Sequence, residues 1–217
     1  MLSLLLGTGI FVIVLGVVNA LLIKRLQFTY SKHFLLFSTL YTSSIFIVFW
    51  FVPELLQYAN QWLGIVLFST AALLFIYFNF LWGKHVDITT CYKYQEIPNH
   101  FKSILCLDAR RGFAKVFEIL LQQVCALFII MGLIEIGLSV ITTVLLFTGV
   151  VFALHITTPK WFGTVYGNYF LWVGTILAPL EVYFILEYSI GFYIASILHM
   201  AMYIVMYSMA YLLRDRG

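Results

Sequence analysis

The sequence predicts an all-α polytopic membrane protein with seven transmembrane helices, the N-terminus outside and the C-terminus in the cytoplasm. Of the 217 residues, 63% are hydrophobic and only 10% are charged, whereas soluble domains are nearer one-quarter charged. The chain contains seven long apolar runs, each near the roughly 20 residues that cross a bilayer core about 30 Å thick. All basic residues follow the odd-numbered runs or lie just inside the next run.

The seven runs account for most of the chain and predict a single helical bundle over residues 1–217. The expected spans are approximately 2–23, 33–52, 61–82, 113–134, 137–157, 163–186 and 189–213. The first run ends in Lys24 and Arg25 and has no basic segment before it, so we expect a retained helix and not a cleaved signal peptide. Between the fourth and fifth runs, Gly132 to Gly137 leaves room only for a tight outer hairpin.

The distribution of charge predicts the orientation. Basic residues form four groups: Lys24, Arg25 and Lys32; Lys84 to Lys115; Lys160; Arg214 and Arg216. The opposite connections contain Glu54, Glu135 and Glu187 and no basic residue. The positive-inside rule therefore places the basic connections in the cytoplasm. The net charge of +3 then reflects loops that face anionic membrane lipid, and no nucleic acid partner is needed to explain it.

One connection is longer and more polar than the others. Residues 83–112 form a cytoplasmic segment interrupted by Pro98, and its second half, from His100 to Arg111, is either an amphipathic helix on the inner surface or a plain loop. We expect a multi-pass integral protein of a bacterial plasma membrane or an equivalent cellular membrane. Cys91, Cys106 and Cys125 have no metal-binding spacing, and no disulfide is expected.

Ionisable residues inside a membrane are costly and suggest a function. Glu135, Glu187 and Glu181 are expected at or near the outer boundary, where water reaches them. Three other residues lie deeper: Glu118 in the fourth run, His155 in the fifth and His199 in the seventh. Glu118 and His155 are expected at a similar depth, roughly 8 Å from the cytoplasmic surface at 1.5 Å per residue. His199 lies deeper and meets them if a water-filled notch opens from the cytoplasm.

Polar neighbours extend this set. Gln122 lies one helical turn after Glu118, Gln123 is adjacent to it, and Tyr203 lies one turn after His199. These side chains either line one cavity or join helices by hydrogen bonds, as polar residues often do in membrane bundles. A carboxylate beside two imidazoles can activate water against a polarised carbonyl. No metal or other cofactor is required, although one Glu and two His also form zinc sites.

The order of these residues resembles the CPBP family of intramembrane proteases, which includes the CAAX prenyl endopeptidases and the bacterial Abi proteins. The family pattern is EExxxR, then FxxxH, then HxxxN or HxxxD. The matching stretches here are Phe117–Gln123, Val151–His155 and His199–Tyr203, within a resemblance that covers roughly residues 110–205. The resemblance implies an endopeptidase that cleaves a membrane-associated peptide or protein at the cytoplasmic side. Glu118 would activate water, His155 would assist, and His199 with Tyr203 would stabilise the oxyanion.

The chain departs from the family pattern at several positions. Glu118 is the only acidic residue of the first motif, and no Arg follows it. If Gln122 stands at the Arg position, Glu118 is the second glutamate; if Gln123 does, Glu118 is the first, the presumed base. The second register is preferred because it retains the base. Tyr203 stands where the family has Asn or Asp.

Two alternatives to the endopeptidase remain open. The first is a catalytically inactive CPBP-like membrane protein that binds a peptide, a lipid or a partner, which the missing Glu, Arg and Asn favour. The second is a small transporter or a subunit of a membrane complex. Gly163, Gly167, Gly174 and Pro179 are suited to breaking the sixth helix, as transporter helices are broken near their sites.

Overall fold

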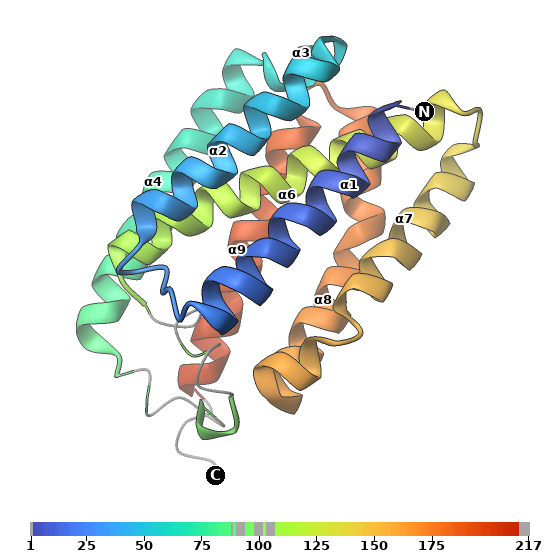
Figure 1. Ribbon diagram of the computed structural model, residues 1–217. Coiled ribbons are helices and arrows are strands. Elements are labelled where there is room, and N and C mark those ends of the chain that lie inside the picture. The colour runs from blue at the N-terminus through green and yellow to red at the C-terminus, as the bar shows by residue number, and fades with distance from the viewer. Residues whose placement is uncertain (1, 88, 90–93, 98–101, 103–106, 213–217) are drawn as a thin grey trace.

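The computed structural model describes residues 2–87, 89, 94–97, 102 and 107–212, and all regular secondary structure in these residues is helical (Figure 1). The elements in chain order are α1 (Leu2–Gly16), a π-helical segment (Val17–Arg25), α2 (Phe34–Phe51), a 3₁₀ turn (Pro53–Leu55), α3 (Leu56–Ala59), α4 (Trp62–His85), a second 3₁₀ turn (Tyr94–Glu96), α6 (Ala109–Glu135), α7 (Val140–His155), α8 (Thr158–Glu187) and α9 (Gly191–Leu212).

Five of the described helices are long and apolar enough to cross a membrane. They are α2, α4, α6, α8 and α9. The other two predicted spans contain shorter apolar helices, at Leu5–Val14 within α1 and at Val140–His155 in α7. α1 is short because the regular α-helix ends at Gly16 and a π-helix continues to the basic pair Lys24 and Arg25. The chain is thus an all-helical, membrane-embedded protein.

Helix ends differ from the predicted ones where capping residues decide them. α6 begins at Ala109 and not near residue 113, because the Asp108 side chain accepts a hydrogen bond from the Arg111 backbone N–H at 2.9 Å. α8 begins at Thr158 and breaks at Gly163, whose φ of 75° and ψ of 167° are not helical. The predicted start of this helix coincides with that break. Half of the segment from His100 to Arg111, for which the sequence predicts an amphipathic helix or a plain loop, lies outside the described residues.

The central helix of the bundle is α6, which is buried along most of its length. It packs against α1, α2, α4 and α9, whereas α7 packs mainly on α8. Figure 1 shows α6 running behind α1 and α2, with the α7–α8 hairpin beside them. The chain reverses between α6 and α7 at Gly137, where φ is 87°. Residues on α6 are therefore fixed by contacts in the core of the bundle. α7 contacts the bundle mainly through α8, its partner in a helical hairpin.

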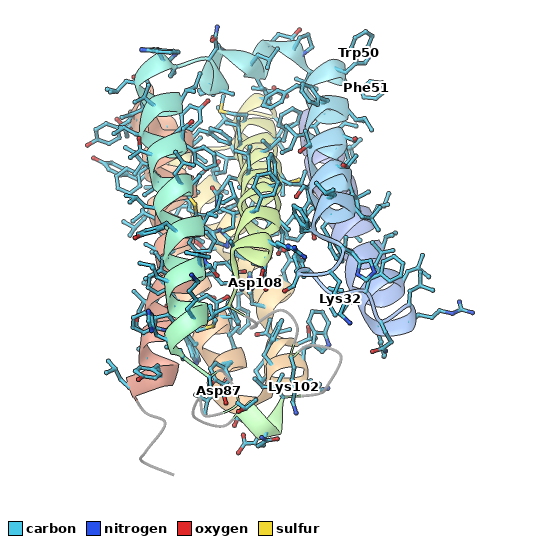
Figure 2. The ribbon with its side chains drawn as sticks, turned by 90° about the vertical axis from the view of Figure 1, so that its left-hand side faces the viewer. Lys32, Trp50, Phe51, Asp87, Lys102 and Asp108 are labelled. Carbon is cyan, nitrogen blue, oxygen red and sulfur yellow. The ribbon has the colours of Figure 1, made fainter. Side chains whose placement is uncertain are left out.

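The two ends of the bundle differ in chemistry. Figure 2 shows Trp50 and Phe51 at one end and Lys32, Asp87 and Lys102 toward the other. Trp50 and Phe51 are both exposed, and exposed aromatic side chains at a helix end are typical of a membrane interface.

Gly191, at the start of α9, is predicted to tolerate no side chain. A methyl group at this position would lie 1.7 Å from the Phe184 carbonyl oxygen in the last turn of α8. We expect Gly191→Ala to lower the free energy of unfolding by about 1–3 kcal/mol, because the backbone must move to accept it. The measurement is thermal unfolding in detergent followed by tryptophan fluorescence.

Gly149→Ala is the matched control, since no atom lies within 4 Å of a methyl group at Gly149 in the middle of α7. Alanine is the better helix former by about 1 kcal/mol, so this variant should unfold at the same temperature as the wild type or slightly above it. Equal unfolding temperatures for the Gly191 and Gly149 variants would contradict the close approach of α8 and α9.

Candidate functional site

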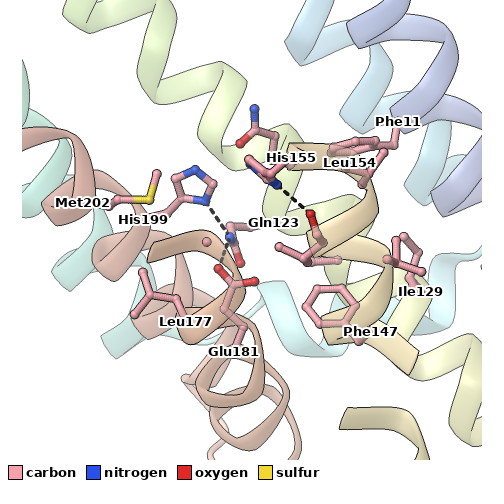
Figure 3. A pocket seen from close by; sticks show the side chains of 15 residues that line it. Phe11, Gln123, Ile129, Phe147, Leu154, His155, Leu177, Glu181, His199 and Met202 are labelled. Carbon is pink, nitrogen blue, oxygen red and sulfur yellow. Dashed lines mark hydrogen bonds between the residues drawn. The ribbon is translucent and has the colours of Figure 1, made fainter. Parts of the chain in front are cut away.

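Five helices enclose a cavity of about 70 Å³ (Figure 3). Its walls are mainly apolar side chains, among them Phe11, Ile129, Phe147, Leu154, Leu177 and Met202. Five polar side chains complete the lining: Gln122, Gln123, His155, Glu181 and His199. These five residues come from α6, α7, α8 and α9, so the cavity gathers polar groups that are distant in the sequence. We call this cavity the pocket.

His155 is the last residue of α7 and is held by its own helix. Its Nδ1 lies 2.8 Å from the Val151 carbonyl oxygen. Because a carbonyl oxygen can only accept, Nδ1 must carry a hydrogen, and in the neutral ring Nε2 is then a hydrogen-bond acceptor. Gly174 of α8 lies beside the ring, since a methyl group there would be 3.7 Å from Nε2. The free nitrogen of His155 thus lies between α7 and α8.

Gln123 joins the two other ionisable groups of the pocket. Its Nε2 lies 3.1 Å from Glu181 Oε1 and 3.1 Å from His199 Nδ1. Figure 3 shows Gln123 between these two side chains, with a dashed hydrogen bond to each. In the described part of the chain, these bonds use one carboxylate oxygen and one ring nitrogen. They leave Glu181 Oε2 and His199 Nε2 available to a molecule in the pocket.

Glu118 belongs to a separate network beside the pocket. Its Oε1 lies 2.6 Å from Lys115 Nζ and 3.0 Å from Gln122 Nε2, and its Oε2 lies 2.5 Å from the Tyr30 hydroxyl. The Tyr30 hydroxyl is also 2.8 Å from that of Tyr41. Glu118 is 6% exposed and is not part of the described pocket wall. Both of its oxygens are therefore occupied by donors.

Tyr30 lies in the connection before α2, and its hydroxyl is firmly protonated. Burial, followed by the neighbouring carboxylate of Glu118, raises the pKa of Tyr30 well above its usual value. It therefore acts as a donor to Glu118 and ties this connection to α6.

The helix geometry explains why the structure separates Glu118 from the histidines. Gln123 follows Glu118 by five residues, which is a rotation of about 140° around the helix axis. Gln123 consequently faces α8 and α9, while Glu118 faces Tyr30. Gln122 lies between the two directions. It bonds to Glu118 and also lines the pocket, so it connects the network with the site.

Tyr203 lies behind His199 and is not among the described lining residues. Its ring stacks on the His199 ring with centroids 5.8 Å apart, and Lys115 Nζ lies 4.5 Å from the Tyr203 ring centre. Of the predicted site residues, the structure thus brings His155, His199, Gln122 and Gln123 to one pocket. It places Glu118 and Tyr203 next to that pocket, outside its wall.

Glu181 lines the pocket but is not among the site residues that the sequence predicts. The sequence predicts Glu181 at or near the outer boundary and in reach of water, whereas in the structure it is only 9% exposed and is bonded to Gln123. α8 continues to Glu187, which puts Glu181 about 9 Å from the helix end. The available signal was its spacing: Glu181 follows Gly174 by seven residues, two turns along the same face.

A metal site is not evident in the described residues. No three His, Cys, Asp or Glu side chains among them lie close enough together to hold a metal ion.

A scan of the chain against protein-family models gives no match, and comparisons with curated proteins and with solved structures give none either.

Proposed function

We propose that the protein is a seven-span membrane endopeptidase that cleaves a membrane-associated peptide or protein at the cytoplasmic side, with its N-terminus outside. One observation carries this proposal: a carboxylate and two imidazoles line a single pocket inside an apolar bundle. In this proposal the two shorter apolar helices, in α1 and α7, also cross the membrane and raise the five longer spans to seven. The position of Lys32 and Lys102 toward one end of the bundle (Figure 2) supports the orientation, since basic residues favour the cytoplasmic face.

The proposed reaction uses water. Glu181 Oε2 and His155 Nε2 each accept a hydrogen bond from a water molecule, and Glu181 takes one proton from it as the hydroxide adds to the peptide carbonyl carbon. His199 Nε2–H donates to the oxygen that becomes negative in this step. The carbon–nitrogen bond then breaks, the proton passes from Glu181 to the leaving nitrogen, and the products are a carboxylic acid and an amine.

This mechanism moves the water-activating role from Glu118 to Glu181. Glu118 is paired with Lys115 at 2.6 Å and accepts two further hydrogen bonds, so three of its roughly four lone-pair sites are occupied and its charge is paired with that of Lys115. In relation to the CPBP pattern, one of the adjacent Gln122 and Gln123 stands at the arginine position, and no carboxylate of α6 is among the described lining residues of the pocket. Both glutamines line the pocket. The carboxylate that α6 lacks there is supplied by α8.

A non-catalytic binding protein is the second candidate, and the same two glutamines favour it. An amide side chain cannot take a proton from water at neutral pH, so neither of the two polar side chains that α6 contributes to the pocket, Gln122 and Gln123, can act as a base. In this alternative, the pocket binds a peptide through the free atoms of His155, His199 and Glu181 without cleaving it.

Proteolysis of membrane proteins tests the proposal. The purified protein is reconstituted in lipid vesicles with solubilised membrane proteins, and new amino termini are identified by labelling and mass spectrometry. We expect termini that arise with the wild type and fall at least about 100-fold with His155→Ala, because general acid–base catalysis is worth 10²–10⁴.

His85→Ala provides the matched control, since His85 also ends a helix but is exposed and lies outside the pocket. It should cleave like the wild type. Equal cleavage by both histidine variants would refute the proposal. Peptides that bind the wild type without cleavage would support the binding protein instead.

A further inference from the structure

Gln123 has an unusual set of hydrogen bonds for a buried amide. It is 2% exposed, and its single nitrogen serves both Glu181 and His199, at 3.1 Å each. Its oxygen, Oε1, is buried without a hydrogen-bond partner among the described residues. A buried carbonyl oxygen without a partner is costly, so an explanation for this orientation is required.

The carboxylate of Glu181 provides that explanation. An ionised carboxylate only accepts hydrogen bonds, so it requires the amide nitrogen of Gln123 and would repel the amide oxygen. If the amide were rotated by 180°, Oε1 could accept a hydrogen bond from His199 Nδ1–H. The same rotation would place Oε1 against the carboxylate of Glu181. When Glu181 is ionised, its charge therefore fixes the direction of the amide, and the unpaired Oε1 is the result.

We infer that Gln123 is a positioning residue that fixes His199 as the tautomer with hydrogen on Nε2. One amide hydrogen of Gln123 points to Glu181 and the other to His199 Nδ1, which must then accept. The remaining hydrogen of the neutral ring is on Nε2, the atom left available to a molecule in the pocket. The direction of one carboxylate–amide bond thus determines which nitrogen of His199 donates.

The consequence is that the two histidines of the pocket have opposite roles. His155 donates from Nδ1 to a backbone carbonyl and presents an acceptor, whereas His199 accepts at Nδ1 and presents a donor. Such a pair suits a ligand with a carbonyl oxygen on the His199 side and a hydroxyl or water on the His155 side. This reading of the ligand rests on the proposed function, but the tautomer itself does not.

Nuclear magnetic resonance of the histidine ring nitrogens tests the inference without any substrate. The full-length protein, labelled with ¹⁵N in its histidines, is measured in lipid nanodiscs at neutral pH, and His199→Asn identifies the signals of His199 by their loss. In the wild type, we expect a hydrogen on Nε2 of His199 and none on Nδ1. Gln123→Glu replaces the donor with an acceptor and should move a hydrogen to Nδ1.

Gln122→Glu is the matched control, because Gln122 lines the same pocket and makes no hydrogen bond to His199. The same change of charge at this position should leave the His199 tautomer as in the wild type. Gln123→Met removes the donor without adding charge, and both tautomers of His199 should then be present.

A wild-type His199 with hydrogen on Nδ1 would overturn the inference, and this measurement requires only the assignment variant His199→Asn to be folded. A His199 tautomer unchanged in both Gln123 variants would also overturn it. The proposed function can fail on its own. If the wild type has the expected tautomer but cleaves no membrane peptide, the inference about Gln123 stands and the proposed protease activity is rejected.

Discussion

Replacing Glu181 with Gln is expected to lower kcat for peptide hydrolysis by ~10²–10⁴-fold, the range typical of losing a general base. The replacement is nearly isosteric. The new amide can still accept from Gln123 through its oxygen, so the bond from α6 to α8 is retained. Its nitrogen then takes the place of Oε2, and a donor that cannot take a proton replaces the acceptor that faces the pocket. KM should change much less than kcat.

Two variants control for this effect. Glu187→Gln makes the same chemical change on the same helix, but Glu187 is exposed at the end of α8, and activity should be unchanged. Glu118→Gln tests whether Glu118 or Glu181 is the general base. Full activity in Glu181→Gln, together with loss in a folded Glu118 variant, would return the role of base to Glu118.

The second large effect concerns the buried ion pair of α6. Lys115 and Glu118 are almost completely buried and 2.6 Å apart. Glu118→Gln leaves the ammonium group of Lys115 without its counter-charge, and breaking a buried pair in this way costs about 3–5 kcal/mol. We therefore expect a large fall in the free energy of unfolding, measured by chemical unfolding in detergent with tryptophan fluorescence as the signal.

The double variant Lys115→Met with Glu118→Gln should recover most of that loss. Removing both charges leaves no unpaired ion, and replacing a whole buried pair by neutral groups is often tolerated. The amide oxygen can still accept from Tyr30 or Gln122. A double variant as unstable as the sum of its single variants would show that the two residues do not interact, and would contradict the ion pair.

Much of the bundle could be predicted because apolar runs determine where helices form. Each of the seven predicted stretches is largely helical, and the errors occur at the ends. Asp108 extends α6 backward as a cap, and Gly163 breaks α8 near the start that was predicted for it. Such ends depend on single side chains and backbone angles, which hydropathy does not report.

The candidate site could be predicted only in part, since depth along a helix does not fix rotation around it. His155, His199, Gln122 and Gln123 do line one pocket. The carboxylate in that wall is Glu181, because its face of α8 turns inward. One signal about Glu118 was available in the sequence: Lys115 precedes it by three residues, the spacing of an ion pair on a helix.

The length of α7 has a consequence for the membrane around the pocket. Its 16 residues span about 24 Å at 1.5 Å per residue, whereas the hydrocarbon core is about 30 Å thick. In the proposed topology, lipid beside α7 must thin or its headgroups must sink to meet the helix ends. His155 is the last residue of this helix. The hydrophobic mismatch would therefore draw the hydrated lipid surface toward the imidazole that binds water in the proposed mechanism.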